Sequence, residues 1–169
     1  YTSSYTLSLH DALPIRIARE GVTVPSQHKL VAPNRLPSDA MSVLYRAVRE
    51  GNETAEEARR ILDGITTMGI RLLGDRVSRA TAWRVAEKLG WADTAHAEYV
   101  AVAQLQADAL VAPDPELASA ADGVVPLRLP AHHHIAALQR LQETGNFRRI
   151  ILQVGIQHQH QLAPHGMEA

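Results

Sequence analysis

Short apolar segments alternate with longer helical segments along this chain, and that alternation constrains the fold more than any other feature. The apolar segments are 29–33, 70–74, 109–114 and 123–129. Each is bounded by Pro, Gly, Asn or Asp, the residues that commonly end a strand. Strands that alternate with helices favour a parallel sheet covered by helices. The sequence therefore predicts an α/β fold.

Four helices are predicted between the strands. The first begins at Pro37 or Ser38 and ends at Gly51; the second, within 52–69, begins at Asn52 or Thr54. The third lies within 78–91 and ends at Gly90, and Asp93 or Thr94 caps the fourth. The apolar residues expected to face inward recur at three and four positions: Met41, Leu44, Tyr45 and Val48 in the first, Ala58, Ile61, Leu62 and Ile65 in the second, and Ala97, Val100, Ala101 and Leu105 in the fourth.

Length and composition are those of one globular domain. Of the 169 residues, 46% are hydrophobic and 21% charged, and the formal net charge is −1. The charge gives no overall attraction to nucleic acid. The chain has no cysteine, which excludes disulfides and zinc–thiolate sites, and we expect a cytoplasmic protein. No apolar run approaches the roughly 20 residues that cross a bilayer, so no membrane partner is expected.

Both ends differ in character from the middle of the chain. Residues 1–15, "YTSSYTLSLHDALPI", resemble translated sequencing-adapter sequence, and we expect them to be artefactual. A first strand of the domain would then be missing or altered. The domain itself is expected over 16–130, with a short helix at 116–121. A His-rich, weakly structured tail is expected over 131–169, with at most one helix at 131–143.

Three carboxylates are expected at one edge of the sheet. Asp114 ends a strand, Asp39 lies in the first turn of the helix after another strand, and Asp93 starts the helix before the strand of Asp114. Carboxylates that gather repel one another, and Mg²⁺ or Mn²⁺ relieves the repulsion. Such an ion would activate water and polarise a phosphate. The alternative is that these residues are helix caps and turn residues.

Three segments, "LVAPNRLPSDAMSVLYRAVREGNETAEEARRILDGI", "RVSRATAWRVAEKLGWADTAHAEYVAVAQLQADALVAPDPELA" and "GVVPLRL", resemble the PIN domain of VapC-type toxins from actinobacterial type II toxin–antitoxin systems. The resemblance covers about residues 16–130. It implies a three-layer α/β/α sandwich on a short parallel sheet. It also implies Mg²⁺-dependent RNA cleavage, a homodimer, and an antitoxin protein that occludes the site.

The resemblance also assigns site residues. Asp39 matches the second acid of the family and Asp114 the fourth. His96 stands where the family has its third acid; imidazole suits Mn²⁺ better than Mg²⁺. Asp93, one helical turn back, is the expected substitute. The first acid would precede residue 16, and Asp11 lies only near that place.

The remaining polar residues receive structural interpretations. Glu98 is expected to be solvated or ion-paired, and the histidines after residue 130 are not expected to form a zinc site. Two functions remain open. The first is a metal-dependent endoribonuclease, the toxin of a toxin–antitoxin pair, with Asp39, Asp93 and Asp114 as catalytic residues and His96 as a further metal ligand. The second is a degraded PIN-like module that binds antitoxin or RNA without cleavage.

Overall fold

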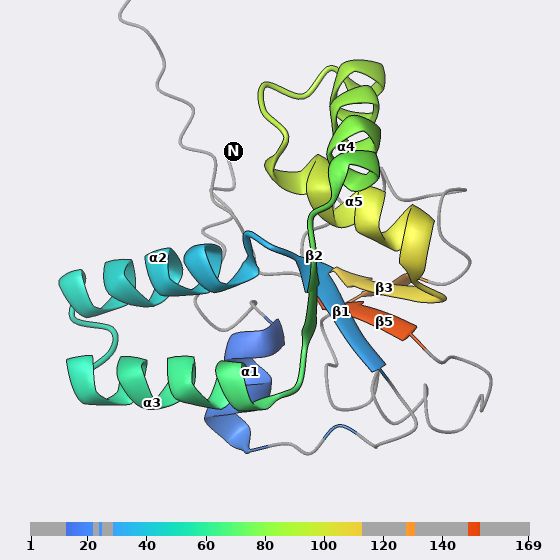
Figure 1. Cartoon of the computed structure of the whole chain (residues 1–169). Helices are drawn as coiled ribbons and strands as arrows, with labels where there is room; N and C mark the ends of the chain where they lie inside the picture. The colour runs from blue at the N-terminus through green and yellow to red at the C-terminus, as the bar shows by residue number, and fades with distance from the viewer. Residues whose placement is uncertain (1–12, 22–23, 25–28, 113–127, 131–148, 153–169) are drawn as a thin grey trace, which may run out of the picture.

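The computed structural model describes residues 13–21, 24, 29–112, 128–130 and 149–152 of the chain. These residues form a mixed α/β structure in which every strand is parallel to its neighbours (Figure 1). The elements in chain order are α1 (Leu13–Glu20), β1 (Lys29–Pro33), α2 (Leu36–Arg49), α3 (Ala55–Thr67), β2 (Arg71–Leu73), α4 (Arg76–Leu89), α5 (Ala95–Gln106), β3 (Ala109–Ala112), β4 (Arg128–Pro130) and β5 (Arg149–Leu152). The predicted α/β class is confirmed.

The strand order of the sheet is β2-β1-β5-β3-β4. Val31 of β1 is paired with Arg71 of β2 on one side and with Ile151 of β5 on the other. Ile151 is also paired with Leu110 of β3. Because the strands are parallel, their carboxyl ends lie at one edge of the sheet, where functional groups of such folds collect.

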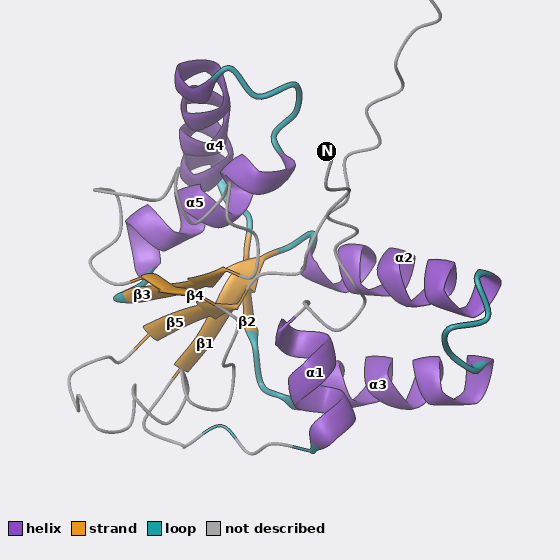
Figure 2. Ribbon diagram, turned by 180° about the vertical axis from the view of Figure 1, so that it is seen from behind, coloured by secondary structure: helices purple, strands orange, loops and turns teal. Residues whose placement is uncertain are grey.

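Two groups of helices flank the sheet (Figures 1 and 2). Helices α4 and α5 pack on each other, and α5 contacts β1 and β5. Helices α1, α2 and α3 form the second group, in which α3 contacts both of the others. None of the helices in the described part of the chain is both long enough and apolar enough to cross a membrane.

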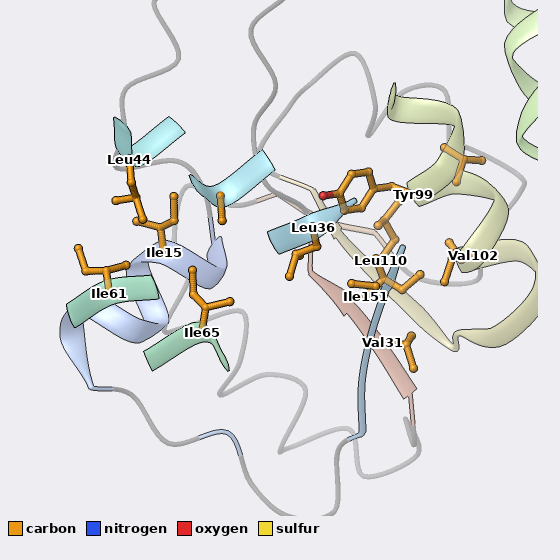
Figure 3. Close-up of a cluster of buried hydrophobic side chains, with 14 of the residues drawn as sticks. Ile15, Val31, Leu36, Leu44, Ile61, Ile65, Tyr99, Val102, Leu110 and Ile151 are labelled. Carbon is orange, nitrogen blue, oxygen red and sulfur yellow. The ribbon is translucent and has the colours of Figure 1, made fainter. Parts of the chain in front are cut away.

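The hydrophobic core joins the two groups of helices through the sheet. Figure 3 shows Ile15, Leu44, Ile61 and Ile65 gathered between α1, α2 and α3. Tyr99, Val102, Leu110 and Ile151 gather between α5 and the sheet in the same view, and Leu36 lies between the two sets. Leu36 therefore fixes the start of α2 against the sheet.

Local sequence explains where the helices begin and end. The side chain of Thr54 accepts a hydrogen bond from the backbone N–H of Glu57 at the start of α3, and Asp75 caps α4 in the same way through Ser78. Gly90 ends α4 with φ of 67°, a left-handed conformation that residues with a Cβ rarely adopt. The ends predicted at Thr54 and Gly90 are confirmed.

The predicted inward face of α2 is wrong at two positions. Met41 is 55% exposed and Tyr45 is 67% exposed. The buried stripe consists instead of Leu36, Ala40, Leu44 and Ala47. The two alanines allow close packing at their positions, so α2 is rotated away from the stripe that its larger apolar residues suggest.

Helix α5 is buried on almost every side, between α4 and the sheet. Every residue from Ala95 to Ala103 except Glu98 is buried, whereas Leu105, predicted to face inward, is 41% exposed. A helix that is apolar all round carries no periodic signal that would mark its inner face. The prediction for Leu105 is therefore wrong, and those for Ala97, Val100 and Ala101 are confirmed.

The two ends of the chain contribute more to the fold than expected. Leu13 and Ile15 of α1 are fully buried, although they fall within the segment expected to be artefactual. Gly64 of α3 lets α1 approach, because a Cβ there would lie 3.1 Å from that of Ala18. Strand β5, which lies in the expected weakly structured tail, is the middle strand of the sheet. The helices expected at 116–121 and 131–143 lie outside the described residues.

Candidate functional site

A polar cluster lies where α2 and α5 begin, beside the carboxyl end of β1. Asp39 is in the first turn of α2, and Glu98 is in the first turn of α5. Arg35, in the turn between β1 and α2, and Tyr99 of α5 connect them. We call Arg35, Asp39, Glu98 and Tyr99 the Arg35 cluster. It joins segments about 60 residues apart in the chain.

Arg35 binds Asp39 through two parallel hydrogen bonds. Its Nε donates to Oδ2 of Asp39 at 2.8 Å, and its Nη2 donates to Oδ1 at 3.1 Å. This bidentate geometry is the strongest that a guanidinium makes with a carboxylate. The third nitrogen, Nη1, lies 3.5 Å from Oε1 of Glu98. One cation thus bridges two carboxylates from different helices.

Tyr99 connects this cluster to the core. Its ring is fully buried, and in Figure 3 its hydroxyl points away from α5. The hydroxyl donates a hydrogen bond of 3.1 Å to Oδ2 of Asp39. Asp39 is held from two sides, by Arg35 and by Tyr99, and its side chain is only 12% exposed. Its orientation is therefore fixed before any ligand arrives.

The electrostatics of the cluster are dominated by the ion pair. Burial works to lower the pKa of Arg35, but its hydrogen bond to Asp39 and the charges of Asp39 and Glu98 outweigh that effect and raise the pKa. The guanidinium is therefore always protonated here. Both carboxylates also lie in first helical turns, where the helix dipole favours negative charge. The cluster is built to hold anionic oxygen beside a cation.

Asp93 makes a capping contact at the start of α5, as expected if it is a helix cap and not a metal ligand. Its Oδ1 accepts a hydrogen bond of 2.8 Å from the backbone N–H of Ala95, just at the start of α5. Its proposed part in metal binding stays a prediction.

His96 lies in the first turn of α5 and is 5% exposed. Its ring meets that of Trp91 edge to face, with the ring centroids 5.8 Å apart and the planes at 76°. This packing explains a buried histidine at the position where the resemblance implies an acid. The side chain helps to pack α5 against the segment that follows α4.

The third expected acid, Asp114, lies outside the described residues, as does Asp11. Among the residues that are described, no three His, Asp or Glu side chains are placed so that they could share a metal ion. The convergence of Asp39, Asp93 and Asp114 thus stays a prediction. The structure instead brings Asp39 and Glu98 together at the guanidinium of Arg35.

Sequence reasoning missed the roles of Arg35 and Tyr99. The spacing of Arg35 and Asp39, four residues apart across a helix start, is a recognisable ion-pair signal. Nothing in the sequence links Tyr99 to Asp39, because their contact depends on how α5 packs against α2. The expectation that Glu98 is solvated or ion-paired agrees with its contact to Arg35.

Comparison with known proteins adds no identification. No protein-family model, curated protein or solved structure matches this chain.

Proposed function

We propose that this chain is a PIN-like domain, a three-layer α/β/α sandwich, and the metal-dependent endoribonuclease of a VapC-type toxin–antitoxin pair. The observation that carries the proposal is the meeting of Asp39 and Glu98 around one cationic group beside the carboxyl end of β1. The position of these two carboxylates supports the proposal, because functional sites of parallel-sheet folds form at the carboxyl ends of the strands.

Asp39 is the central ligand of the proposed ion. Its oxygens, with those of Glu98, are the hard donors that Mg²⁺ or Mn²⁺ prefers, and the guanidinium of Arg35 marks the place where a cation is favourable. Asp114 and Asp93 would complete the set, with His96, which stands where the family has its third acid, as a further ligand. When bound, the ion would activate water and polarise the RNA phosphate.

The residues of the chain itself would position this site. The hydroxyl of Tyr99 donates to Oδ2 of Asp39 and so restrains this carboxylate from α5. Thr94 Oγ1 lies 3.4 Å from Oε1 of Glu98 and restrains the second carboxylate. Of the two acids, Asp39 is the more firmly positioned, because its contact to Tyr99 does not depend on Arg35.

RNA cleavage tests the proposal directly. The full chain is incubated with RNA and Mg²⁺ or Mn²⁺, with and without EDTA, beside the Asp39→Asn, Asp114→Ala and Asp63→Asn variants. Asp63 is an exposed residue of α3 and serves as the matched control. We expect cleavage that EDTA abolishes and that falls at least about 100-fold in the first two variants. Cleavage that is indifferent to EDTA, or equal in Asp114→Ala, contradicts the proposal.

A second candidate function is favoured by His96 and Arg35. A histidine buried against Trp91 replaces the third acid, and both oxygens of Asp39 already have a cationic partner. These features suit a module that binds RNA or an antitoxin without cutting. For this function, RNA would stay intact in the same assay, and neither the wild type nor a variant without Arg35 would bind Mn²⁺ in calorimetry up to millimolar concentrations.

The proposed partners are RNA, an antitoxin protein and a second copy of the chain, in the cytoplasm. The exposed side chains of Met41 and Tyr45 support a dimer through α2, since they lie one helical turn apart. Sedimentation of the wild type beside a Met41→Ser, Tyr45→Ser double variant tests it. A dimer that the double variant breaks supports this surface, and an unchanged dimer contradicts it.

A further inference from the structure

Arg35 is held in place by its backbone. It occupies the position before the first residue of α2, with φ of −73° and ψ of −19°. The preceding residue, Asn34, donates its N–H to the carbonyl oxygen of Leu73 at the end of β2. The carbonyl of Arg35 accepts the N–H of Asp39. The turn therefore sets Arg35 and Asp39 one helical turn apart, at the distance that the ion pair needs.

The guanidinium occupies the carboxylate oxygens that a metal ion would use. It binds Oδ1 and Oδ2 of Asp39 and lies beside Oε1 of Glu98. A divalent cation coordinates such oxygens at about 2.0–2.6 Å. At that place it would lie close to the fixed positive charge of Arg35, so the two cations repel each other strongly. The guanidinium and the divalent ion would therefore compete for these carboxylates.

The side chain of Arg35 is partly exposed to solvent and can move away from the two carboxylates. It is 27% exposed, and Glu98 is 31% exposed. The bidentate pair with Asp39, whose side chain is 12% exposed, is the stronger of the two contacts, but because Arg35 itself is partly open to water, its release costs less than that of a fully buried pair. The hydrogen bond from Tyr99 to Asp39 does not involve Arg35, so it would still orient Asp39 after the guanidinium had moved.

We propose that Arg35 is a built-in competitor for the divalent cation: the metal binds Asp39 and Glu98 only when the guanidinium has moved away. This inference rests on the proposed function, because it takes the metal site from it. The apparent affinity for the ion is then reduced by the fraction of molecules in which Arg35 still occupies the carboxylates.

Binding of Mn²⁺ to the full chain tests this competition without any activity assay. Free Mn²⁺ is followed by electron paramagnetic resonance in titrations of the wild type, Arg35→Gln and Arg60→Gln. Arg60 is the matched control, because it pairs with Glu57 on the exposed face of α3. We expect Arg35→Gln to bind Mn²⁺ at least about tenfold more tightly than the wild type, and Arg60→Gln to bind it as the wild type does.

Two further variants test whether tighter Mn²⁺ binding depends on Asp39 and on the geometry of the guanidinium. Asp39→Asn added to Arg35→Gln should remove the gain, because the gain depends on the released carboxylate. Arg35→Lys keeps the charge without the bidentate geometry, so a smaller gain is expected from it. It also serves if Arg35→Gln does not fold, which circular dichroism reports.

The outcomes separate this inference from the proposed function. If the wild type binds Mn²⁺ and neither Arg35 variant binds it more tightly, the competition is overturned while the metal site stands. If folded wild type and folded Arg35 variants all fail to bind Mn²⁺ at millimolar concentration, the metal site itself is refuted, and the competition with it.

Discussion

Tyr99 is the residue that joins the hydrophobic core to the polar cluster. Its ring is fully buried among residues from α2, α5 and the sheet, and its hydroxyl reaches Asp39. A buried hydroxyl must have a partner, because an unpaired one is costly. The packing of α5 and the orientation of Asp39 are therefore coupled through one side chain.

Replacing Tyr99 with Phe should destabilise the protein by about 1–2 kcal/mol, since it removes a hydrogen bond to a charged acceptor and leaves the ring in place. Urea denaturation followed by circular dichroism measures the change. Tyr45→Phe is the control, because that side chain is 67% exposed, and it should change stability by less than about 0.5 kcal/mol. Equal effects of the two variants would argue against the contact with Asp39.

Asp75 gives the stability a pH dependence. The backbone N–H and then the hydroxyl of Ser78 donate to its carboxylate and lower its pKa below the ordinary value. A lowered folded-state pKa contributes stability that is present above the ordinary value of about 4 and is lost as the pH falls through the folded-state pKa.

We therefore expect the wild type to lose more stability than Asp75→Asn between about pH 5 and pH 2.5. Asn keeps an oxygen that can cap α4 but has no charge to lose. Thermal unfolding of both proteins across this range measures the difference. A gap between the two midpoints that stays constant down to the lowest pH would show that Asp75 does not titrate as described.

At the scale of the element, helix starts follow local chemistry and helix faces follow packing. The caps at Thr54 and Asp75 each use a side chain and a backbone N–H three residues on. The inner face of α2 instead depends on Ala40 and Ala47, which sit where larger side chains would not fit. Propensity and capping act within a few residues, whereas a buried face needs a partner surface.

Thr54→Ala should cost about 1 kcal/mol, because the N–H of Glu57 loses its acceptor at the start of α3. Thr54→Ser should keep most of the stability. Thr66→Ala is the control on the same helix, since the Thr66 hydroxyl only bonds back to the carbonyl of Leu62, and it should be neutral or slightly stabilising. Chemical denaturation of the three variants measures these changes, and a loss in Thr66→Ala as large as in Thr54→Ala would contradict the cap.

At the scale of the whole molecule, the sheet depends on a strand from late in the chain. β5 lies between β1 and β3, and Ile151 is fully buried in the core. Each neighbour of β5 would otherwise present unpaired backbone groups within the sheet. Among the described strands, the backbone pairing between the two halves of the sheet therefore runs through β5.

Ile151→Ala should destabilise the protein by about 2–5 kcal/mol, the range for removing a large apolar side chain from a packed core. Val77→Ala is the control, because Val77 is 58% exposed, and it should cost less than about 0.5 kcal/mol. Equilibrium unfolding in urea measures both. A cost below about 1 kcal/mol for Ile151→Ala would contradict the central position of β5.

The sequence by itself determined the α/β class, the strand Lys29–Pro33, and the helix boundaries at Thr54 and Gly90. These features come from apolar periodicity, capping and glycine conformation, which act over a few residues. It also placed Asp39 in a first helical turn near a strand end, where the structure has it.

Only the tertiary structure decided that Asp39 contacts Tyr99 and shares Arg35 with Glu98, and that β5 is the middle strand. The same is true of the outward position of Met41 and Tyr45 and of the burial of Leu13 and Ile15. Each of these depends on which surfaces meet across long separations in the chain. Packing decides that choice, since the free energy of burying a face depends on the shape of its partner, which no local pattern encodes.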